Sequence, residues 1–362
     1  MQKRVEILKI DPNHPEDEKI KKAANFIKNG KLVAFPTETV YGLGVDGLRT
    51  DAIKRLFEVK KRPKGKPISL LISDFNDLER LSKNIPQEAW KIIDKFWPGP
   101  LTIVLFASDL VPQIIKGRKL TVGLRMPDNK IALSLIESSQ TPIACPSANI
   151  SGAKEPTTSK ELMANLKDKI DLIIDGGKTK VGVASTVLDL TGKTPIIIRQ
   201  GAISSKELLE VLNSKNILFV CTGNTCRSFM AEKLFSKMAK EANLLVEVNS
   251  AGTSAISGGT VSELTLKTLE KQGIKPDIAF TTSLTERIIK KADLILTMES
   301  YHKKRVLDIL PLAKEKTFLL TEYAGLEKKD ILDPVGGSRE GYETCLIEIK
   351  KCLTRVIKRL MK

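Results

Sequence analysis

A cysteine and an arginine lie six residues apart in the stretch FVCTGNTCRS, which ends at Ser228. Cys221 ends an apolar run that favours a β-strand, and a helical pattern begins after Arg227. A loop between a strand and a helix can direct its backbone N–H groups at an anion, and the helix dipole adds positive potential. We therefore predict that Cys221 is a nucleophile with a lowered pKa and that Arg227 binds two phosphoryl oxygens.

Other residues near this loop could supply what phosphoryl transfer to sulfur requires. Gly223 lets the backbone turn without a Cβ clash, and the Ser228 hydroxyl can donate to the thiolate. The departing group needs a proton donor, and Asp333 on the constrained loop ILDPVGGS is the candidate. The remaining predicted phosphate-loop residues are Thr222, Asn224, Thr225 and Cys226.

A second set of candidate residues lies in the first half of the chain. They are Lys60, Arg62 and Lys66 in EVKKRPKGKP, Ser147 and Asn149 in CPSANISG, and Ser185 and Arg199 further on. A proline-stiffened basic loop suits a polyphosphate, so this half binds an anion, or it carries a solvated basic face and ordinary turns. No Gly-x4-Gly-Lys-Ser/Thr loop is present in the sequence, so a nucleotide would be held in another way.

The composition indicates a globular protein with a strong positive charge. The net charge of +16 comes from 59 Lys and Arg against 43 Asp and Glu, spread along the chain. Two explanations stay open: a surface that attracts RNA or anionic substrates, or a lysine-rich proteome. The apolar runs are too short for a membrane helix, and the first residues lack a secretory signal pattern. We expect a cytoplasmic protein with no membrane partner.

Histidine and cysteine usage excludes several classes of site. The chain has only His14 and His302, far apart in sequence, which makes a Ser-His-Asp triad or a histidine-rich metal site improbable. None of the five cysteines forms a Cys-x-x-Cys pair, so zinc and thioredoxin-like motifs are not indicated. We predict no resident metal.

The elements that must position these residues fall into two α/β domains, as 362 residues at ~150 per domain would suggest. Residues 16–29 have helical spacing, and residues 31–44 are expected to form a strand that breaks at Gly42 and Gly44. If the central part of this strand is extended, Thr37, Thr39 and Tyr41 lie on one face. Many short strands follow, typical of a mixed twisted sheet that is partly antiparallel. A helical segment reaching Asn213 then precedes a new strand.

The second half alternates strands and helices. A strand before Cys221 is followed by a helix over 228–240, a strand over 244–250, a helix over 261–272, a strand over 293–298 and a long C-terminal helix. This pattern predicts a doubly wound, four-stranded parallel sheet. We expect a first domain over 1–205, a linker over 206–214 and a second domain over 215–362.

The motifs of the second half resemble the low-molecular-weight protein tyrosine phosphatase family. VCTGNTCRS, NSAGTSA, ADLILTMES and DPVGGS occur in that order. The resemblance implies Cys221 as nucleophile, Arg227 as phosphate clamp and Asp333 as general acid, with no cofactor. This chain departs from the family in carrying Phe229 where members usually have proline after the Arg-Ser pair, which removes a residue preorganised for a helix start.

Two residues of the loop bear on substrate and redox behaviour. Thr225 resembles the bacterial branch that acts on phosphoarginine, so we expect phosphoarginine first and phosphotyrosine second. Cys226 either protects Cys221 reversibly as a disulfide or packs. Arsenate reduction would need relay thiols, but Cys345 and Cys352 are about 10 Å apart along the predicted helix, too far for a disulfide. We expect these two cysteines to be core residues.

The motifs of the first half resemble the threonylcarbamoyl-AMP synthase family, which has the YrdC-type fold. They are FPTETVYGLG, KKRPKGKP, WPGPLTIVL, TVGLRMPD, PSANISG, STVLDL and IRQGAI, in order over residues 20–203. The resemblance implies condensation of L-threonine, bicarbonate and ATP, with Mg²⁺ accompanying the ATP, and release of pyrophosphate. The product serves t6A modification of tRNA, so tRNA or tRNA-modification enzymes are possible partners.

Site residues follow from this resemblance position by position. Threonine binding is expected of Thr39, Arg125 and Ser185, and ATP binding of Lys60, Arg62, Lys66, Thr121, Ser147, Asn149 and Arg199. Leu71 and Asn129 stand where many members carry histidine. The chain is thus predicted to be a bifunctional enzyme that fuses a synthase to a phosphatase. The alternative for the first half is a nucleotide- or RNA-binding module without synthase activity.

Overall fold

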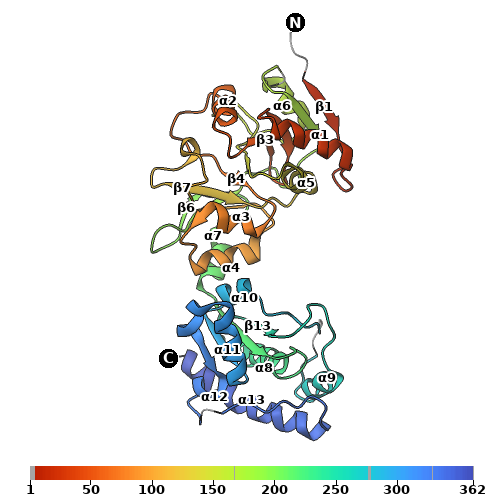
Figure 1. The fold of residues 1–362 in the computed structure, drawn as a ribbon, viewed down its shortest axis with the longest axis vertical. Helices are drawn as coiled ribbons and strands as arrows, with labels where there is room; N and C mark the ends of the chain where they lie inside the picture. The colour runs from red at the N-terminus through yellow and green to blue at the C-terminus, as the bar shows by residue number, and fades with distance from the viewer. Residues whose placement is uncertain (1–4, 167, 276–278, 328, 362) are drawn as a thin grey trace. The chain divides into compact units, whose positions relative to one another are not determined.

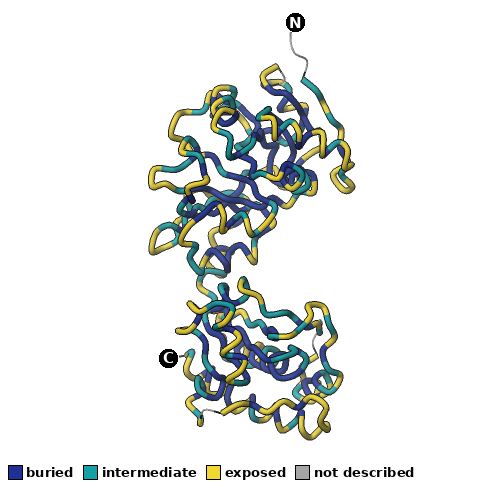
Figure 2. Tube along the Cα trace, viewed as in Figure 1, coloured by how far each residue is buried: buried dark blue, intermediate teal, exposed yellow. Residues whose placement is uncertain are grey.

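The chain folds into two compact α/β units, Met1–Leu212 and Asn213–Lys362. The computed structural model describes residues 5–166, 168–275, 279–327 and 329–361. Figure 1 follows the elements of each unit in chain order, and Figure 2 shows buried segments running through the interior of each. Among the described residues, no helix combines the length and apolar character needed to cross a membrane.

The first unit is built on a mixed sheet, as predicted, which has eleven strands in the described part of the chain. Its order is β1-β9-β2-β3-β8-β4-β7-β6-β10-β11, with β5 paired to β6. The strands are β1 (Glu6–Lys9), β2 (Val33–Pro36), β3 (Tyr41–Asp46), β4 (Leu70–Leu71), β5 (Ser82–Lys83), β6 (Leu101–Ala107), β7 (Thr121–Arg125), β8 (Ile143–Ala144), β9 (Leu172–Asp175), β10 (Thr186–Asp189) and β11 (Ile196–Arg199).

Helices surround this sheet and bury its apolar side chains. They are α1 (Asp17–Lys28), α2 (Thr50–Lys60), α3 (Phe75–Leu81), α4 (Gln87–Phe96), η1 (Gln113–Ile115), α5 (Lys130–Ser139), α6 (Ser159–Leu166) and α7 (Ser205–Asn213). The predicted apolar stripe of α1, from Ile20 to Ile27, is buried against β2, β9 and α5. Helical spacing of these residues is what allows one face of α1 to pack there.

Helix α4 brings two aromatic side chains into the core of the first unit. Trp90 is buried on α4, and Trp97, just after it, donates its indole N–H to the carbonyl of Leu101 at 2.8 Å. The rings of Trp97 and Phe75 are in contact, with centroids 6.4 Å apart. An indole N–H that is buried needs such a partner, so this hydrogen bond fixes Trp97 at the start of β6.

The prediction of one extended segment over 31–44 is wrong. The segment is a hairpin in which β2 and β3 pair antiparallel, Val33 with Gly44 and Pro36 with Tyr41. Thr37 closes the turn, because its hydroxyl oxygen accepts hydrogen bonds from the N–H groups of Thr39 and Val40. The Thr37 and Thr39 hydroxyls still lie 2.8 Å apart, but Tyr41 is not in their row, since its hydroxyl donates to the carbonyl of Gly177.

The segment expected to link the domains is mostly helical. Helix α7 covers most of residues 206–214 and ends at Asn213, where the sequence predicts the end of a helix. Leu208 is fully buried in the core of the first unit, while its neighbour Leu209 is exposed. Helix α7 is thus part of the first unit, since its apolar face packs there.

The second unit is a four-stranded parallel sheet with helices on both faces, as predicted. The strand order is β13-β12-β14-β15, and all three strand pairs are parallel. The elements are β12 (Lys215–Cys221), α8 (Arg227–Glu241), β13 (Val246–Gly252), α9 (Glu263–Glu270), α10 (Glu286–Lys291), β14 (Leu294–Thr297), α11 (Ser300–Ile309), η2 (Pro311–Lys316), β15 (Thr317–Leu319), α12 (Leu320–Tyr323) and α13 (Arg339–Leu360).

Strand β12 is central in this sheet and is apolar on both sides. Ile217 and Phe219 belong to one core cluster, with α8 and α13, whereas Leu218 and Val220 belong to another, with α11. Alternate residues of a strand point to opposite faces, so a continuous apolar run is what a doubly covered strand requires. Cys221 is the last residue of this strand.

Candidate active sites

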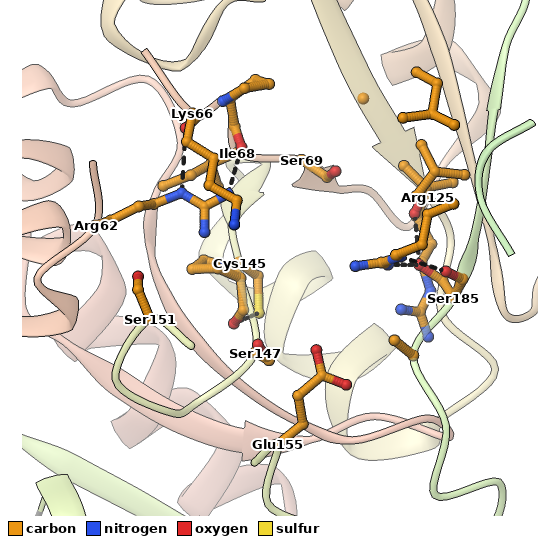
Figure 3. Close-up of a pocket in the computed structure, with 18 of the residues that line it drawn as sticks. Arg62, Lys66, Ile68, Ser69, Arg125, Cys145, Ser147, Ser151, Glu155 and Ser185 are labelled. Carbon is orange, nitrogen blue, oxygen red and sulfur yellow. Dashed lines mark hydrogen bonds between the residues drawn. The ribbon is translucent and has the colours of Figure 1, made fainter. Parts of the chain in front are cut away.

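A cavity of about 820 Å³ opens in the first unit. All ten residues predicted to bind ATP or threonine line it: Thr39, Lys60, Arg62, Lys66, Thr121, Arg125, Ser147, Asn149, Ser185 and Arg199. Figure 3 shows Arg62 and Lys66 together on one side of the cavity, and Arg125 with Ser185 on the other. The fold thus gathers motifs separated by up to 160 positions, and the individual binding roles stay predictions.

The basic side of the cavity is preorganised by backbone contacts. The Arg62 guanidinium donates to the carbonyls of Lys66 at 3.2 Å and Pro67 at 2.6 Å, which holds the loop closed on itself. Burial, and then the charge of Arg199, lower the pKa of Arg62. Two guanidinium groups near enough to perturb one another make this region suited to several negative charges.

Lys60 contacts the neighbouring turn. Its ammonium donates to the backbone carbonyls of Ser147 and Asn149, and the Ser147 hydroxyl donates to the Asn149 side chain at 2.7 Å. Burial lowers the pKa of Lys60 to about 8. The structure therefore gives Lys60 the task of fixing the Ser-x-Asn turn, since the carbonyls occupy its N–H donors.

Arg125 is the buried cation on the opposite side. Its Nη2 donates to the Thr39 hydroxyl at 2.9 Å and lies 2.7 Å from Oε1 of Glu38, and its Nε donates to the carbonyl of Gly99. These contacts aim the guanidinium and leave Nη1 for a ligand. Glu38 was not among the predicted residues, although its place beside Thr39 in FPTETVYG was a usable signal.

The structure shows where two departures from the family pattern, Leu71 and Asn129, lie. Leu71 is buried and lines the cavity, so an apolar wall stands where many relatives carry histidine. Asn129 is the N-cap of α5, and its side chain accepts from the N–H of Ala132 at 3.0 Å.

Cys145 and Glu155 also line the cavity and were not predicted. Burial raises the pKa of the Cys145 thiol to about 12.

The phosphate loop of the second unit connects β12 to α8. The thiol of Cys221 is buried, its Sγ lies 2.9 Å from the Ser228 hydroxyl, and it accepts from the N–H of Asn224 at 3.3 Å. The structure thus brings Cys221, Ser228 and the loop backbone together, as the sequence predicts. Phe229 is buried in the core on the first turn of α8, where its ring also contacts Lys233.

The left-handed turn of this loop is at Asn224 and not at Gly223. Asn224 has φ of 56°, a conformation that asparagine adopts more readily than most residues. Its side-chain amide donates to the hydroxyls of Ser228 and Ser250 at 2.9 and 2.8 Å. Gly223 has no positive φ, but a Cβ there would lie 3.3 Å from the Thr225 hydroxyl oxygen.

The prediction of a lowered pKa for Cys221 is wrong for this conformation. Burial raises the pKa of the thiol, although the hydrogen bond from Ser228 and the charge of Arg227 oppose the rise. Arg227 is buried, and it forms ion pairs with Glu299 and with Asp333. Its positive charge is therefore balanced by two carboxylates, which weakens its stabilisation of a thiolate.

Residues from distant segments complete the surroundings of the loop. The Thr222 hydroxyl lies 2.8 Å from Nε2 of the fully buried His302 on α11, a contact that sequence spacing does not indicate. Cys226 contacts the Tyr342 hydroxyl at 3.4 Å. Cys345 and Cys352 are core residues of α13, which confirms that prediction.

Within the described residues, no group of three or more His, Cys, Asp or Glu side chains could hold a metal ion. The cavity of the first unit instead concentrates cations that match phosphate oxygens.

Two family models match the chain, one in each unit. A family model for Sua5, YciO and YrdC proteins, described as "Telomere recombination", matches residues 25–201. The model for low molecular weight phosphotyrosine protein phosphatase matches residues 216–362.

Individual relatives match the first unit. A threonylcarbamoyl-AMP synthase of Pyrococcus abyssi is 50% identical over 202 residues, which are 56% of this chain and 59% of that protein. A relative from Methanocaldococcus jannaschii is 37% identical over 53% of this chain and 92% of its own length. The chain spans somewhat more than half the length of the first of these.

A solved structure extends the similarity. The crystal structure of P. abyssi Sua5 complexed with L-threonine is 29% identical, covers 97% of each chain and has a TM-score of 0.56. The two resemblances predicted from the motifs are confirmed by the family models. This chain belongs to the threonylcarbamoyl-AMP synthase family through its first unit, and its second unit matches the family model for low molecular weight phosphotyrosine protein phosphatase.

Proposed function

We propose that the first unit condenses L-threonine, bicarbonate and ATP into threonylcarbamoyl-AMP, releases pyrophosphate, and thereby supplies t6A modification of tRNA in the cytoplasm. The observation that carries the proposal is the cavity that joins a basic loop to a buried guanidinium. The complex of P. abyssi Sua5 with L-threonine supports it. RNA-modification enzymes, or tRNA itself, would be the partners of such a unit.

In this proposal each wall of the cavity has one task. Arg62, Lys66, Thr121 and Arg199 hold the triphosphate, with Mg²⁺ adding charge neutralisation, and Lys60 holds the Ser147–Asn149 turn against the nucleotide. Arg125 pairs with the threonine carboxylate beside Thr39 and Ser185. The threonine amine bonds to the carbon of bicarbonate and water leaves. A carbamate oxygen then attacks the α-phosphorus, and pyrophosphate departs.

The test is pyrophosphate release by the full chain. We expect release that requires threonine and bicarbonate together, and we expect Arg125→Met to abolish it by removing the carboxylate's partner. ATP binding should persist in Arg125→Met, which makes this variant its own folding control. ATP binding by the parent without any pyrophosphate release would instead support a nucleotide-binding module.

We propose that the second unit hydrolyses phosphorylated protein residues through a cysteinyl-phosphate intermediate. A phosphoryl group would take over the Arg227 N–H groups that now contact Asp333 and Glu299. The Cys221 sulfur then bonds to phosphorus while the bond to the leaving nitrogen or oxygen breaks, and Asp333 gives that atom a proton. Water attacks the intermediate and releases inorganic phosphate. The contact of Cys221 with Ser228 at 2.9 Å carries the proposal.

Phosphoarginine is the proposed preferred substrate. The Thr225 side chain is partly exposed on the loop, and its hydroxyl lies 3.4 Å from Cys226. A hydroxyl at this position can accept a hydrogen bond from a guanidinium N–H, whereas a phenyl ring offers no donor.

Matched phosphoarginine and phosphotyrosine peptides test both claims on the full chain. We expect faster hydrolysis of phosphoarginine, loss of all turnover in Cys221→Ser, and a shift toward phosphotyrosine in Thr225→Ile. Turnover of Cys221→Ser at the parent rate would overturn the nucleophile. A preference for phosphotyrosine in the parent would overturn only the substrate choice, and thiol-dependent reduction of arsenate would identify a reductase.

A further inference from the structure

We propose that Thr102 is a positioning residue of the synthase site, whose hydroxyl donates to Ser185 and so makes Ser185 a hydrogen-bond donor to a carboxyl-type oxygen of the substrate. Thr102 is buried on β6 and lines the cavity. It lies beside Val187 of β10 in the parallel β6–β10 pair, two residues beyond Ser185. The inference rests on the proposed synthase function.

The hydrogen bonds of Ser185 define the question. The oxygens of the Thr102 and Ser185 hydroxyls are 2.9 Å apart, and either residue could supply the proton. Arg199 donates from Nη2 to the Ser185 hydroxyl oxygen at 3.0 Å and from Nε to the Ser185 carbonyl at 3.0 Å. A guanidinium can only donate, so one of the two lone pairs of the Ser185 oxygen is already used.

Which of the two hydroxyls donates in the Thr102–Ser185 hydrogen bond determines whether Ser185 can donate to a ligand. If Thr102 donates, both lone pairs of the Ser185 oxygen are occupied and its proton is free for the cavity. If Ser185 donates instead, it has only a lone pair left, which repels an anion. The substrates proposed for this cavity all present anionic oxygens, and Arg125 faces the same space (Figure 3). Donation by Thr102, which leaves the Ser185 proton for the ligand, is therefore the arrangement that suits these substrates.

Gly123 of β7 leaves room for the Thr102 side chain. A Cβ placed on Gly123 would lie 2.6 Å from the Ser69 hydroxyl oxygen and 3.2 Å from the Thr102 methyl group, so the glycine provides space that both side chains use. With the methyl on that side, the hydroxyl is directed at Ser185. Threonine is stiff at χ1, so it has few other rotamers.

The inference is tested on the full chain by comparing a Thr102 variant that lacks the hydroxyl with one that keeps it. We expect Thr102→Val, which keeps the shape, to raise the KM for threonine or for bicarbonate about tenfold, as loss of one hydrogen bond would. Thr102→Ser should stay within about twofold of the parent. The KM for ATP should not change in either variant. Which of the two KM values rises identifies the oxygen that Ser185 contacts.

Combining the Thr102 substitution with a Ser185 substitution distinguishes a positioning role of Thr102 from a packing role. In Ser185→Ala, which removes the acceptor, adding Thr102→Val should have no further effect on either KM, because the two residues act as a unit. If Thr102→Val does not fold, Thr102→Ser and Thr102→Ala, which differ only in the hydroxyl, provide the same comparison. Parent-like KM values in the variants without a hydroxyl, or an equal rise for ATP, would overturn the inference.

Failure of the proposed synthase function can be distinguished from failure of the inference about Thr102. A parent that releases no pyrophosphate would refute synthase activity, and calorimetric titration with threonine would then still compare Thr102→Ser with Thr102→Ala. Equal threonine affinity of those two variants, or no threonine binding by the parent, would overturn the role of Thr102.

Discussion

Lys60 is a charged side chain enclosed by the turn that it supports. Its pKa of about 8 lies below the ordinary value of 10.5, because burial disfavours the ammonium. Between these two pH values the unfolded chain binds the proton more strongly than the folded chain, so folding becomes more favourable as pH rises. The hydrogen bonds to the Ser147 and Asn149 carbonyls, however, need the ammonium.

We therefore predict that affinity for a non-hydrolysable ATP analogue falls severalfold as pH rises from 7 to 9.5, through the pKa of Lys60 at about 8. The terminal phosphate of the analogue loses its last proton near neutral pH, and this contribution is the same for every variant. Lys60→Arg, which stays charged, is therefore the control and should lose less affinity over this range than the parent. The same decline in Lys60→Arg as in the parent would refute the prediction. Calorimetric titration at each pH supplies the measurement.

Single residues also show what the sequence could not predict. Motif matches placed all ten candidate ligands on one cavity, because a family's ligand positions keep their order along the chain. The contacts of Thr222 with His302 and of Arg227 with Glu299 join residues more than 70 positions apart, and no local periodicity encodes them. The predicted direction of the Cys221 pKa shift was wrong because burial, which the local sequence does not reveal, outweighs the hydrogen bond from Ser228 and the charge of Arg227.

Helix α7 is the element that ends the first unit, and its packing suggests a stability test. Leu208→Ala removes a fully buried side chain and should lower the free energy of unfolding of the first unit by about 2–5 kcal/mol. Leu209→Ala, at an exposed position on the same helix, should change it by less than about 0.5 kcal/mol.

Urea denaturation of the two variants measures the difference. Equal stability of Leu208→Ala and Leu209→Ala would show that α7 contributes nothing to that core, and that the segment behaves as a simple connection.

Helices and strands were predicted correctly where one hydrophobic periodicity, helical or extended, dominates the segment. The apolar run before Cys221 and the stripe of α1 produced correct elements because both are buried as their spacing requires. Residues 31–44 were misread because β-branched and aromatic residues continue through the turn. The hydrogen bonds of the Thr37 side chain, not a glycine or proline, make that turn, and such a signal is weak in sequence.

At the scale of the whole molecule, each unit has its own sheet, core and candidate site. We therefore predict that Cys221→Ser removes phosphatase turnover and leaves pyrophosphate release unchanged. Arg125→Met should have the reverse effect. Parallel assays of both activities on the two full-length variants provide the measurement, and a drop of more than about twofold in the untouched activity would contradict independence.

The tryptophans described in the core of the first unit give the molecule a built-in optical probe. The chain contains two tryptophans, Trp90 on α4 and Trp97 directly after it, and both are buried. The second unit has tyrosines but no tryptophan. Indole emission, excited at wavelengths that tyrosine does not absorb, will therefore report on the melting of the first unit alone, while far-ultraviolet circular dichroism records both units. The two signals together resolve a two-step unfolding curve without any label.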